Sequence, residues 1–153
     1  MLNLKINPSK LFITLIYLIF LTIFHWGLKP DFSILLFLGG GIFGVYFLDL
    51  AEQFFKSSPS LTTSGSPFRN VLFQVVLVIL TLFVLTSSGS LFGAGLVLSI
   101  ALGMLLEERL EWRSQGNLNS WFWIVRRDFP LQTQQFYFLA MAGIFIFLSL
   151  LFV

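Results

Sequence analysis

Residues 91–113 read LFGAGLVLSIALGMLLEERLEWR, a run of apolar and small residues that changes abruptly into a charged one at Glu107. A helix that crosses a bilayer needs about 20 mostly apolar residues, with a range of about 17–25. The run from Leu91 to Leu106 lies at the short end of this range. We predict a membrane helix there that continues past the membrane to Ser114 or Gln115, with Gly116 as its stop.

The composition of the whole chain agrees with a lipid environment. Of its 153 residues, 57% are hydrophobic and only 10% are charged, whereas soluble domains contain about 25% charged residues. This excludes a soluble enzyme and a disordered segment. The net charge of +2 provides no basic patch for a phosphate backbone, so no nucleic-acid partner is expected. The absence of cysteine excludes disulfides, thiolate metal sites and a cysteine nucleophile.

Four further segments have the length and composition of membrane spans. We therefore predict an all-α fold, a polytopic membrane bundle of five transmembrane helices that forms a single domain over residues 1–153. The predicted spans are about 11–28, 32–50, 69–86, 90–106 and 134–153. Residues 57–67 form a Ser/Thr/Gly/Pro linker, and residues 107–131 form a second segment outside the membrane.

The basic residues indicate an orientation. If the N-terminus is cytoplasmic, eight of the nine Lys and Arg residues lie on the inner side, and Lys29 alone lies outside. In multi-pass membrane proteins, short loops rich in Lys and Arg lie on the cytoplasmic side. We predict an N-in, C-out protein of the bacterial cytoplasmic (inner) membrane, with the linker and residues 107–131 in the cytoplasm.

Residues 107–131 contain an amphipathic stretch suited to the membrane surface. Asn119 or Ser120 can cap a short helix that begins at Trp121 and ends before Pro130. Indole rings and guanidinium groups favour the headgroup layer. The predicted interfacial anchors are Trp121, Trp123, Arg126 and Arg127.

Small residues predict where the helices approach closely. They are Gly40, Gly44, Gly95, Ser99 and Gly103. Small-xxx-small patterns allow close backbone contact in membranes. They fit packing within one chain, which we favour, or a dimer seam.

Polar positions within the spans allow two interpretations. Asn70, Gln74, Thr81 and Ser88 lie on one face of the third span, either as hydrogen-bonding contacts between helices or as the lining of a polar cavity between helices 1, 3 and 4. His25, the single histidine, fits an interfacial side chain better than an axial ligand of a haem.

Charged residues gather at the cytoplasmic ends of the helices. The candidate cluster comprises Asp49, Glu52, Arg69, Glu107 and Glu108. The acids at the end of the fourth span lie on one side, and Arg109 and Arg113 lie on another. The cluster is either an internal salt-bridge network, which we favour, or a set of carboxylates facing a cation.

The order of these residues resembles a known family. Gly39 to Gly44 precede Leu48-Asp49-Leu50-Ala51-Glu52, Phe68-Arg69-Asn70 opens the next span, and Gly103-Met104-Leu105-Leu106-Glu107 closes the one after. This resembles the membrane-bound metal-dependent hydrolases, small multi-pass inner-membrane proteins with motifs similar to P-D-x-D-H, T-H-S and H-x-x-x-D. Only Asp49 and the carboxylate of Glu107 match in kind. Ala51 replaces the second Asp, and Glu52, Arg69 and Gly103 replace the histidines. The resemblance implies a relative without catalytic activity, in which Arg69 supplies the charge of the missing metal.

The sequence is compatible with two functions. We favour a scaffold or accessory subunit without catalytic residues or cofactors, acting through its cytoplasmic face on a protein partner or a second copy of itself in the lipid bilayer. A Ser-His-Asp triad is excluded because His25 and the acids lie on opposite sides of the membrane. The alternative is a divergent metal-dependent hydrolase. In it, Asp49, Glu52, Glu107 and Glu108 would hold Mg²⁺ or Mn²⁺, and Arg69 would bind a phosphate or carboxylate of a lipid-like substrate.

Overall fold

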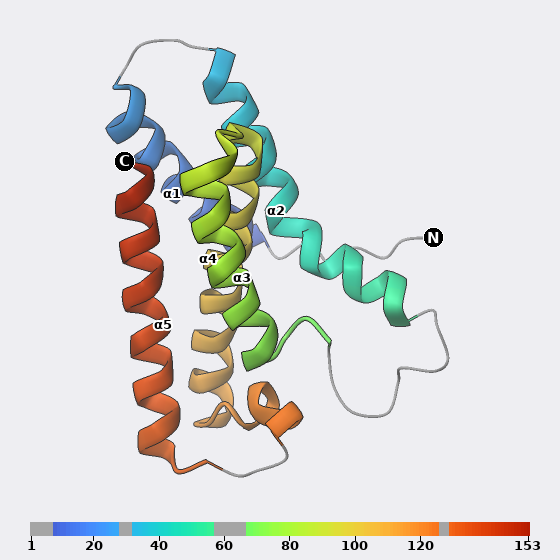
Figure 1. The fold of residues 1–153 in the computed structure, drawn as a ribbon. Helices are drawn as coiled ribbons and strands as arrows, with labels where there is room; N and C mark the ends of the chain where they lie inside the picture. The colour runs from blue at the N-terminus through green and yellow to red at the C-terminus, as the bar shows by residue number, and fades with distance from the viewer. Residues whose placement is uncertain (1–7, 28–31, 57–66, 126–128) are drawn as a thin grey trace.

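The computed structural model describes residues 8–27, 32–56, 67–125 and 129–153, and over these residues the chain is helical with no β-strand (Figure 1). Its elements in order are α1 (Pro8–Trp26), α2 (Phe32–Lys56), α3 (Val71–Phe83), a π-helical turn η1 (Val84–Ser88), α4 (Leu91–Gln115), a 3₁₀ helix η2 (Asn119–Val125) and α5 (Leu131–Phe152).

Five of the described helices are long and apolar enough to cross a bilayer when α3 is counted together with η1. This confirms the predicted helical bundle of a multi-pass membrane protein. The direction in which the bundle is inserted and the bacterial inner membrane as its location stay predictions. Most of the predicted linker, residues 57–66, lies outside the described part of the chain.

Local sequence explains where the helices begin and end. Asn70 caps α3 by accepting a 2.9 Å hydrogen bond from the Phe73 amide, and Ser90 caps α4 by accepting one from Gly93. The predicted extension of the fourth helix to Gln115 is confirmed, and Gly116 ends it with a φ of 71°. The fifth helix begins at Leu131, three residues before the predicted start, because Pro130 fits just before a first helical turn.

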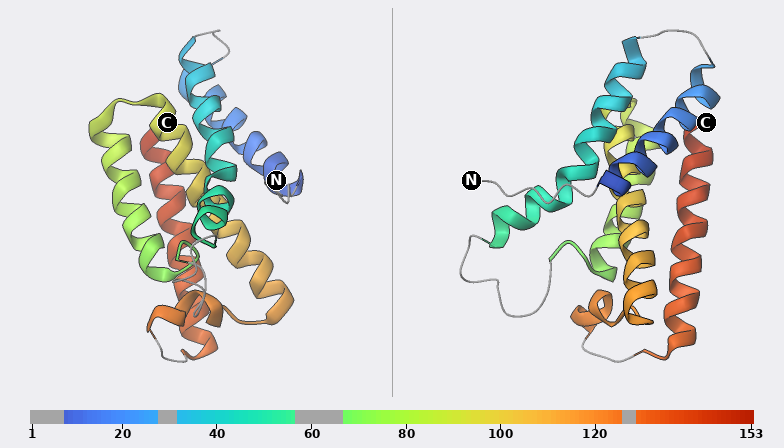
Figure 2. Two further views of the ribbon diagram at one scale, coloured as in Figure 1. Left: turned by 90° about the vertical axis from the view of Figure 1, so that its right-hand side faces the viewer. Right: turned by 180° about the vertical axis from the view of Figure 1, so that it is seen from behind.

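Helix α4 is the centre of the bundle. It packs against the other four long helices, and 50% of its span is buried inside the protein, compared with 17% for α3–η1 and for α5. Figure 1 and Figure 2 show α4 between α3 and α5 on one side and α2 on the other, with α1 lying obliquely across the bundle. The second half of α2 projects sideways from the bundle in these views.

Helices α2 and α4 cross through glycine, at three positions that we call the glycine crossing: Gly40, Gly44 and Gly95. A side-chain carbon on Gly44 would lie only 2.6 Å from the carbonyl oxygen of Leu96. Carbons on Gly40 and Gly95 would overlap the carbonyls of Phe92 and Phe37, respectively. The predicted packing role of these glycines is realised within one chain, because backbone atoms of the facing helix occupy the space of a side chain.

The two other predicted packing residues lie on different sides of α4. Ser99 is fully buried beside Gly41 and Gly44. Gly103 faces α1 instead, where an added side-chain carbon would lie 3.1 Å from the stem of Lys10. The small residues of α4 thus accommodate both α2 and α1.

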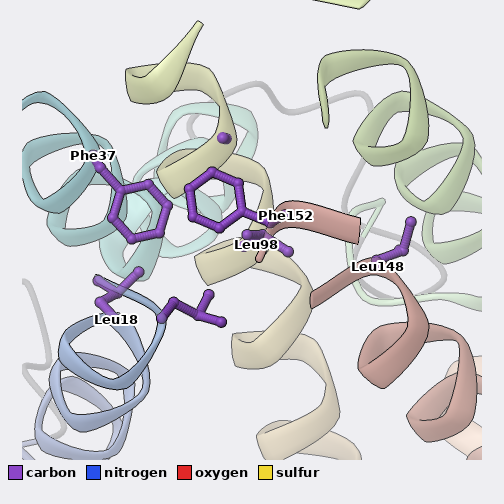
Figure 3. Packing of buried hydrophobic residues seen from close by; sticks show 7 residues of the cluster. Leu18, Phe37, Leu98, Leu148 and Phe152 are labelled. Atoms are coloured by element: carbon purple, nitrogen blue, oxygen red, sulfur yellow. The ribbon is translucent and has the colours of Figure 1, made fainter. Parts of the chain in front are cut away.

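Two apolar clusters fill the remaining space. One has buried residues from α1, α2, α4 and α5, with Val78 of α3 packed against them, and it includes Leu18, Phe37, Leu98, Leu148 and Phe152 (Figure 3). In it, the rings of Phe37 and Phe152 stack with centroids 4.7 Å apart. The second cluster includes Leu48, Leu77, Met104, Leu118 and Trp121, and it lies toward the end of the bundle formed by η2.

Polar contacts join the first and last helices beside the first cluster. The Tyr17 hydroxyl lies 2.7 Å from the Ser149 hydroxyl, and Nδ1 of His25 donates to the Phe152 carbonyl at 2.6 Å. The His25 ring also stacks on Phe152. These contacts hold His25 beside the end of α5, and its position at a membrane interface stays a prediction.

Candidate functional site

Arg69 is the centre of the charged site because its guanidinium group contacts carboxylates from two other helices. Nη2 lies 2.8 Å from Asp49 Oδ1, and Nε lies 3.2 Å from Glu52 Oε1 and 2.7 Å from Glu107 Oε2. The arginine stands just before Asn70, the cap residue of α3, so the start of that helix aims it at α2 and α4. A planar guanidinium with several donors suits such multiple contacts.

Lys10 completes the site from α1. Its ammonium lies 2.5 Å from Glu107 Oε1, and the Lys10 and Glu107 side chains are 10% and 18% exposed. Glu107 therefore receives a positive charge from α1 and another from the segment before α3. We call Lys10, Asp49, Glu52, Arg69 and Glu107 the ion cluster.

The ion cluster agrees with the salt-bridge interpretation of the sequence. Four predicted residues, Asp49, Glu52, Arg69 and Glu107, are brought together, and the guanidinium lies where the carboxylates converge. Among the described residues, no group of three or more His, Asp or Glu side chains is placed to hold a metal ion. The geometry supports electrostatic joining of four chain segments.

Glu108 does not belong to the ion cluster, although the sequence placed it there. It is fully buried and faces α3 and α5, where it lies beside Gln74 and Tyr137. The side chains of Glu107 and Glu108 point in different directions because successive helical residues are about 100° apart. Within the described residues, neither carboxylate oxygen of Glu108 has a hydrogen-bond partner of acceptable geometry.

Glu111, one turn further along α4, fixes η2 to the bundle. Its Oε1 accepts a 2.5 Å hydrogen bond from the Ser120 hydroxyl, and its Oε2 accepts a 3.1 Å bond from the Trp121 indole. Trp121 is only 1% exposed. Its ring therefore packs against protein, and the expectation that it anchors in the headgroup layer is wrong, because the carboxylate of Glu111 satisfies its N–H inside the fold.

The other predicted anchors have different positions. Trp123 is partly exposed, although its indole nitrogen is buried and has no hydrogen-bond partner among the described residues. Arg126 and Arg127 lie outside the described residues. The exposed residues at this end include Arg109, Leu110, Arg113, Ile124 and Val125.

Gln134 holds η2 from the other side. Its Oε1 accepts a 2.6 Å bond from the Leu118 amide, and its Nε2 donates to Asn119 Oδ1 at 2.7 Å and to the Phe129 carbonyl at 2.9 Å. Gln134 is 1% exposed. Residues 118–121 are thus held by hydrogen bonds to both α4 and α5.

The polar face of α3 serves several purposes. Gln74 accepts a hydrogen bond from the Tyr137 hydroxyl and so joins α3 to α5, as the contact interpretation expects. Thr81 bonds to the Leu77 carbonyl of its own helix, and Ser88 is exposed. A cavity of about 20 Å³ does lie on this face, but α3, α4 and α5 line it, and α1 does not. Its lining is Gln74, Leu77, Val78, Thr81, Ala101, Leu105, Met141, Phe145 and Leu148.

Sequence reasoning did not assign Lys10, Glu111, Gln134 or Tyr137 to the site. The position of Lys10 at the end of a span could be read from the sequence, because it immediately precedes an apolar run. No sequence pattern indicated its pairing with Glu107, 97 residues away. Glu111 had the signal of lying on the acidic side of the fourth helix. Gln134 and Tyr137 follow Pro130 in the first turns of a span, where a polar side chain is unremarkable.

Comparison of the chain with protein-family models gave no match, and comparisons with curated proteins and with solved structures gave no significant match. The resemblance to the membrane-bound metal-dependent hydrolases therefore stays a prediction. The function has to be argued from the geometry of the site.

Proposed function

We propose that this protein is a non-catalytic scaffold or accessory subunit that acts through the end of the bundle formed by residues 107–131. The observation that carries the proposal is the position of Arg69, whose guanidinium lies among Asp49, Glu52 and Glu107. A hydrolytic metal on these carboxylates would have to displace that guanidinium, and Lys10 would also have to leave Glu107.

The construction of the bundle end supports a role in binding. Glu111 and Gln134 hold η2 between α4 and α5 through hydrogen bonds of 2.5–3.1 Å. Rigid surfaces bind partners at lower entropic cost than mobile ones. The surface presents charge beside exposed apolar side chains, with Leu110 54% exposed and Val125 48% exposed.

Metal dependence separates this proposal from the hydrolase alternative. We expect the thermal stability of the purified protein in mild detergent to be the same with EDTA and with Mn²⁺. Asp49→Asn should lower stability equally under both conditions, since it weakens the contact with Arg69. Glu111→Gln is the matched control outside the ion cluster. Stabilisation of the wild type by Mn²⁺ that Asp49→Asn abolishes would support the hydrolase instead.

The binding role requires its own measurement. Particle mass in mild detergent should show the chain with a second protein or a second copy in fixed ratio. Leu110→Ser should release that partner, whereas Leu139→Ser should not, because Leu139 is a lipid-exposed residue of α5 with 67% exposure. A wild-type particle containing one chain and only lipid and detergent would contradict the proposal.

A further inference from the structure

Glu108 presents a problem that the ion cluster does not solve. Its side chain is 0% exposed, and neither carboxylate oxygen accepts a well-formed hydrogen bond among the described residues, although the Gln74 amide lies beside it. An ionised carboxylate is very costly to bury unless it is paired and hydrogen-bonded, and in practice such a group becomes neutral.

Among the residues that the structure describes, the groups facing Glu108 provide no compensating positive charge. From α3 it meets Gln74, and from α5 it meets Tyr137, both neutral side chains. Its charged neighbours on α4 are Glu107 and Glu111, which repel a second negative charge. The residues of η2, Asn119 to Val125, include no ionisable side chain, and Lys10 and Arg69 contact Glu107 in the ion cluster.

We propose that Glu108 is a proton-binding site, at which the folded protein holds the side chain as a neutral carboxylic acid between α3, α4 and α5. Binding takes one proton from water and forms one O–H bond, and no other bond changes. The ligand is the proton itself, and the site is distinct from the salt-bridged carboxylates of the ion cluster. The inference does not depend on the proposed scaffold role.

The polar groups around Glu108 suit reversible binding and release of a proton. Gln74 lines the cavity of about 20 Å³ that extends to Thr81, a space that holds about one water molecule. Gln74 also accepts a hydrogen bond from the Tyr137 hydroxyl. Loss of the proton would place a carboxylate beside this amide and hydroxyl, which are the polar groups able to reorient toward it.

Infrared spectroscopy tests the proposal directly on the full chain in lipid vesicles. An exposed glutamate has a pKa of about 4.3 and is ionised at neutral pH, so a carboxylic acid C=O stretching band at neutral pH reports a protonated buried acid. We expect a band equivalent to one acid per chain in the wild type. Glu108→Gln should remove it, and the matched control Glu111→Gln should leave it unchanged.

A second variant and a cation control exclude misfolding and metal binding as explanations of the result. If Glu108→Gln does not fold, Glu108→Asp should retain the band at a shifted frequency, because the acid remains but its surroundings change. Replacing Na⁺ by choline, or adding EDTA, should leave the wild-type band as it is. The proposal is overturned if the wild type has no such band, if the band survives Glu108→Gln, or if it appears only after removal of metal cations.

Discussion

The glycine crossing and the ion cluster join the same helix, α4, to its neighbours by opposite means. At the glycine crossing, the backbones of α2 and α4 approach so closely that no side chain fits between them. At the ion cluster, long charged side chains reach across from α1, α2 and the start of α3 to Glu107. The first contact depends on shape and has no tolerance for added atoms. The second depends on charge and can adjust through flexible side chains.

The largest expected effect is on the glycine crossing. Gly95→Leu should prevent formation of the folded bundle, at a cost above about 3 kcal/mol, because the new side chain meets the Phe37 backbone and overpacking against backbone is poorly relieved. The yield of monodisperse protein in detergent measures this. Gly143→Leu is the control, since the space around Gly143 is open, and it should change stability by less than about 0.5 kcal/mol. Equal tolerance of both variants would contradict the assigned crossing.

The next effect concerns the ion cluster. Lys10→Met should lower the free energy of unfolding by about 2–3 kcal/mol, somewhat less than the usual loss from breaking a buried pair, because Arg69 still contacts Glu107. A double-mutant cycle with Glu107→Gln should give a coupling energy of about 1–3 kcal/mol. Additive effects of the two substitutions would show that the 2.5 Å contact contributes nothing to stability.

A smaller loss of stability is expected at Gln134, which holds its neighbours through hydrogen bonds and not through ion pairs. Gln134→Leu removes three hydrogen bonds to residues 118, 119 and 129. Hydrogen bonds in membrane proteins average about 0.6 kcal/mol each, so the total loss should be about 2 kcal/mol. Amide exchange at Leu118 should become faster, since its acceptor is lost. Gln135→Leu, an exposed neighbour, should leave this exchange rate unchanged. A wild-type exchange rate in Gln134→Leu would rule out this anchoring role.

The smallest expected effect is at Glu111. Glu111→Gln keeps one acceptor but removes the charge that strengthens the bonds from Ser120 and Trp121, and should cost about 0.5–1 kcal/mol. The near-ultraviolet circular dichroism of the tryptophans should change because the Trp121 ring is less firmly held. Arg113→Gln is the exposed control, and an identical spectral change in it would argue against a specific role of Glu111.

The contrast between the two regions also explains what could be predicted from the sequence. The helices and the glycine crossing depend on local composition and on four-residue spacing, so Gly40, Gly44 and Gly95 were correctly assigned to close packing. The α4 stop at Gly116 was predictable for the same reason, since only a residue tolerant of positive φ fits there.

The partners within the charged region were less accessible. Position near a helix end predicted that Asp49, Glu52, Arg69 and Glu107 would lie together, but the participation of Lys10 depends on the oblique path of α1. Glu108 was misassigned because adjacency in sequence does not mean a shared helix face. Trp121 was misassigned because amphipathic composition fits a lipid surface and a protein interior equally well, and only the hydrogen bond from its indole to Glu111 distinguishes them.

The contact between His25 and Phe152 has a consequence for biogenesis. The two residues are 127 positions apart, and at synthesis rates of about 5–20 residues per second the later one emerges about 6–25 s after the earlier one. The glycines of α2 likewise have no α4 to meet until Leu91 and its successors have been made. The early helices must therefore remain in the membrane with exposed backbone and unpaired polar groups, and this interval is when an insertion factor or chaperone has the most surface to protect.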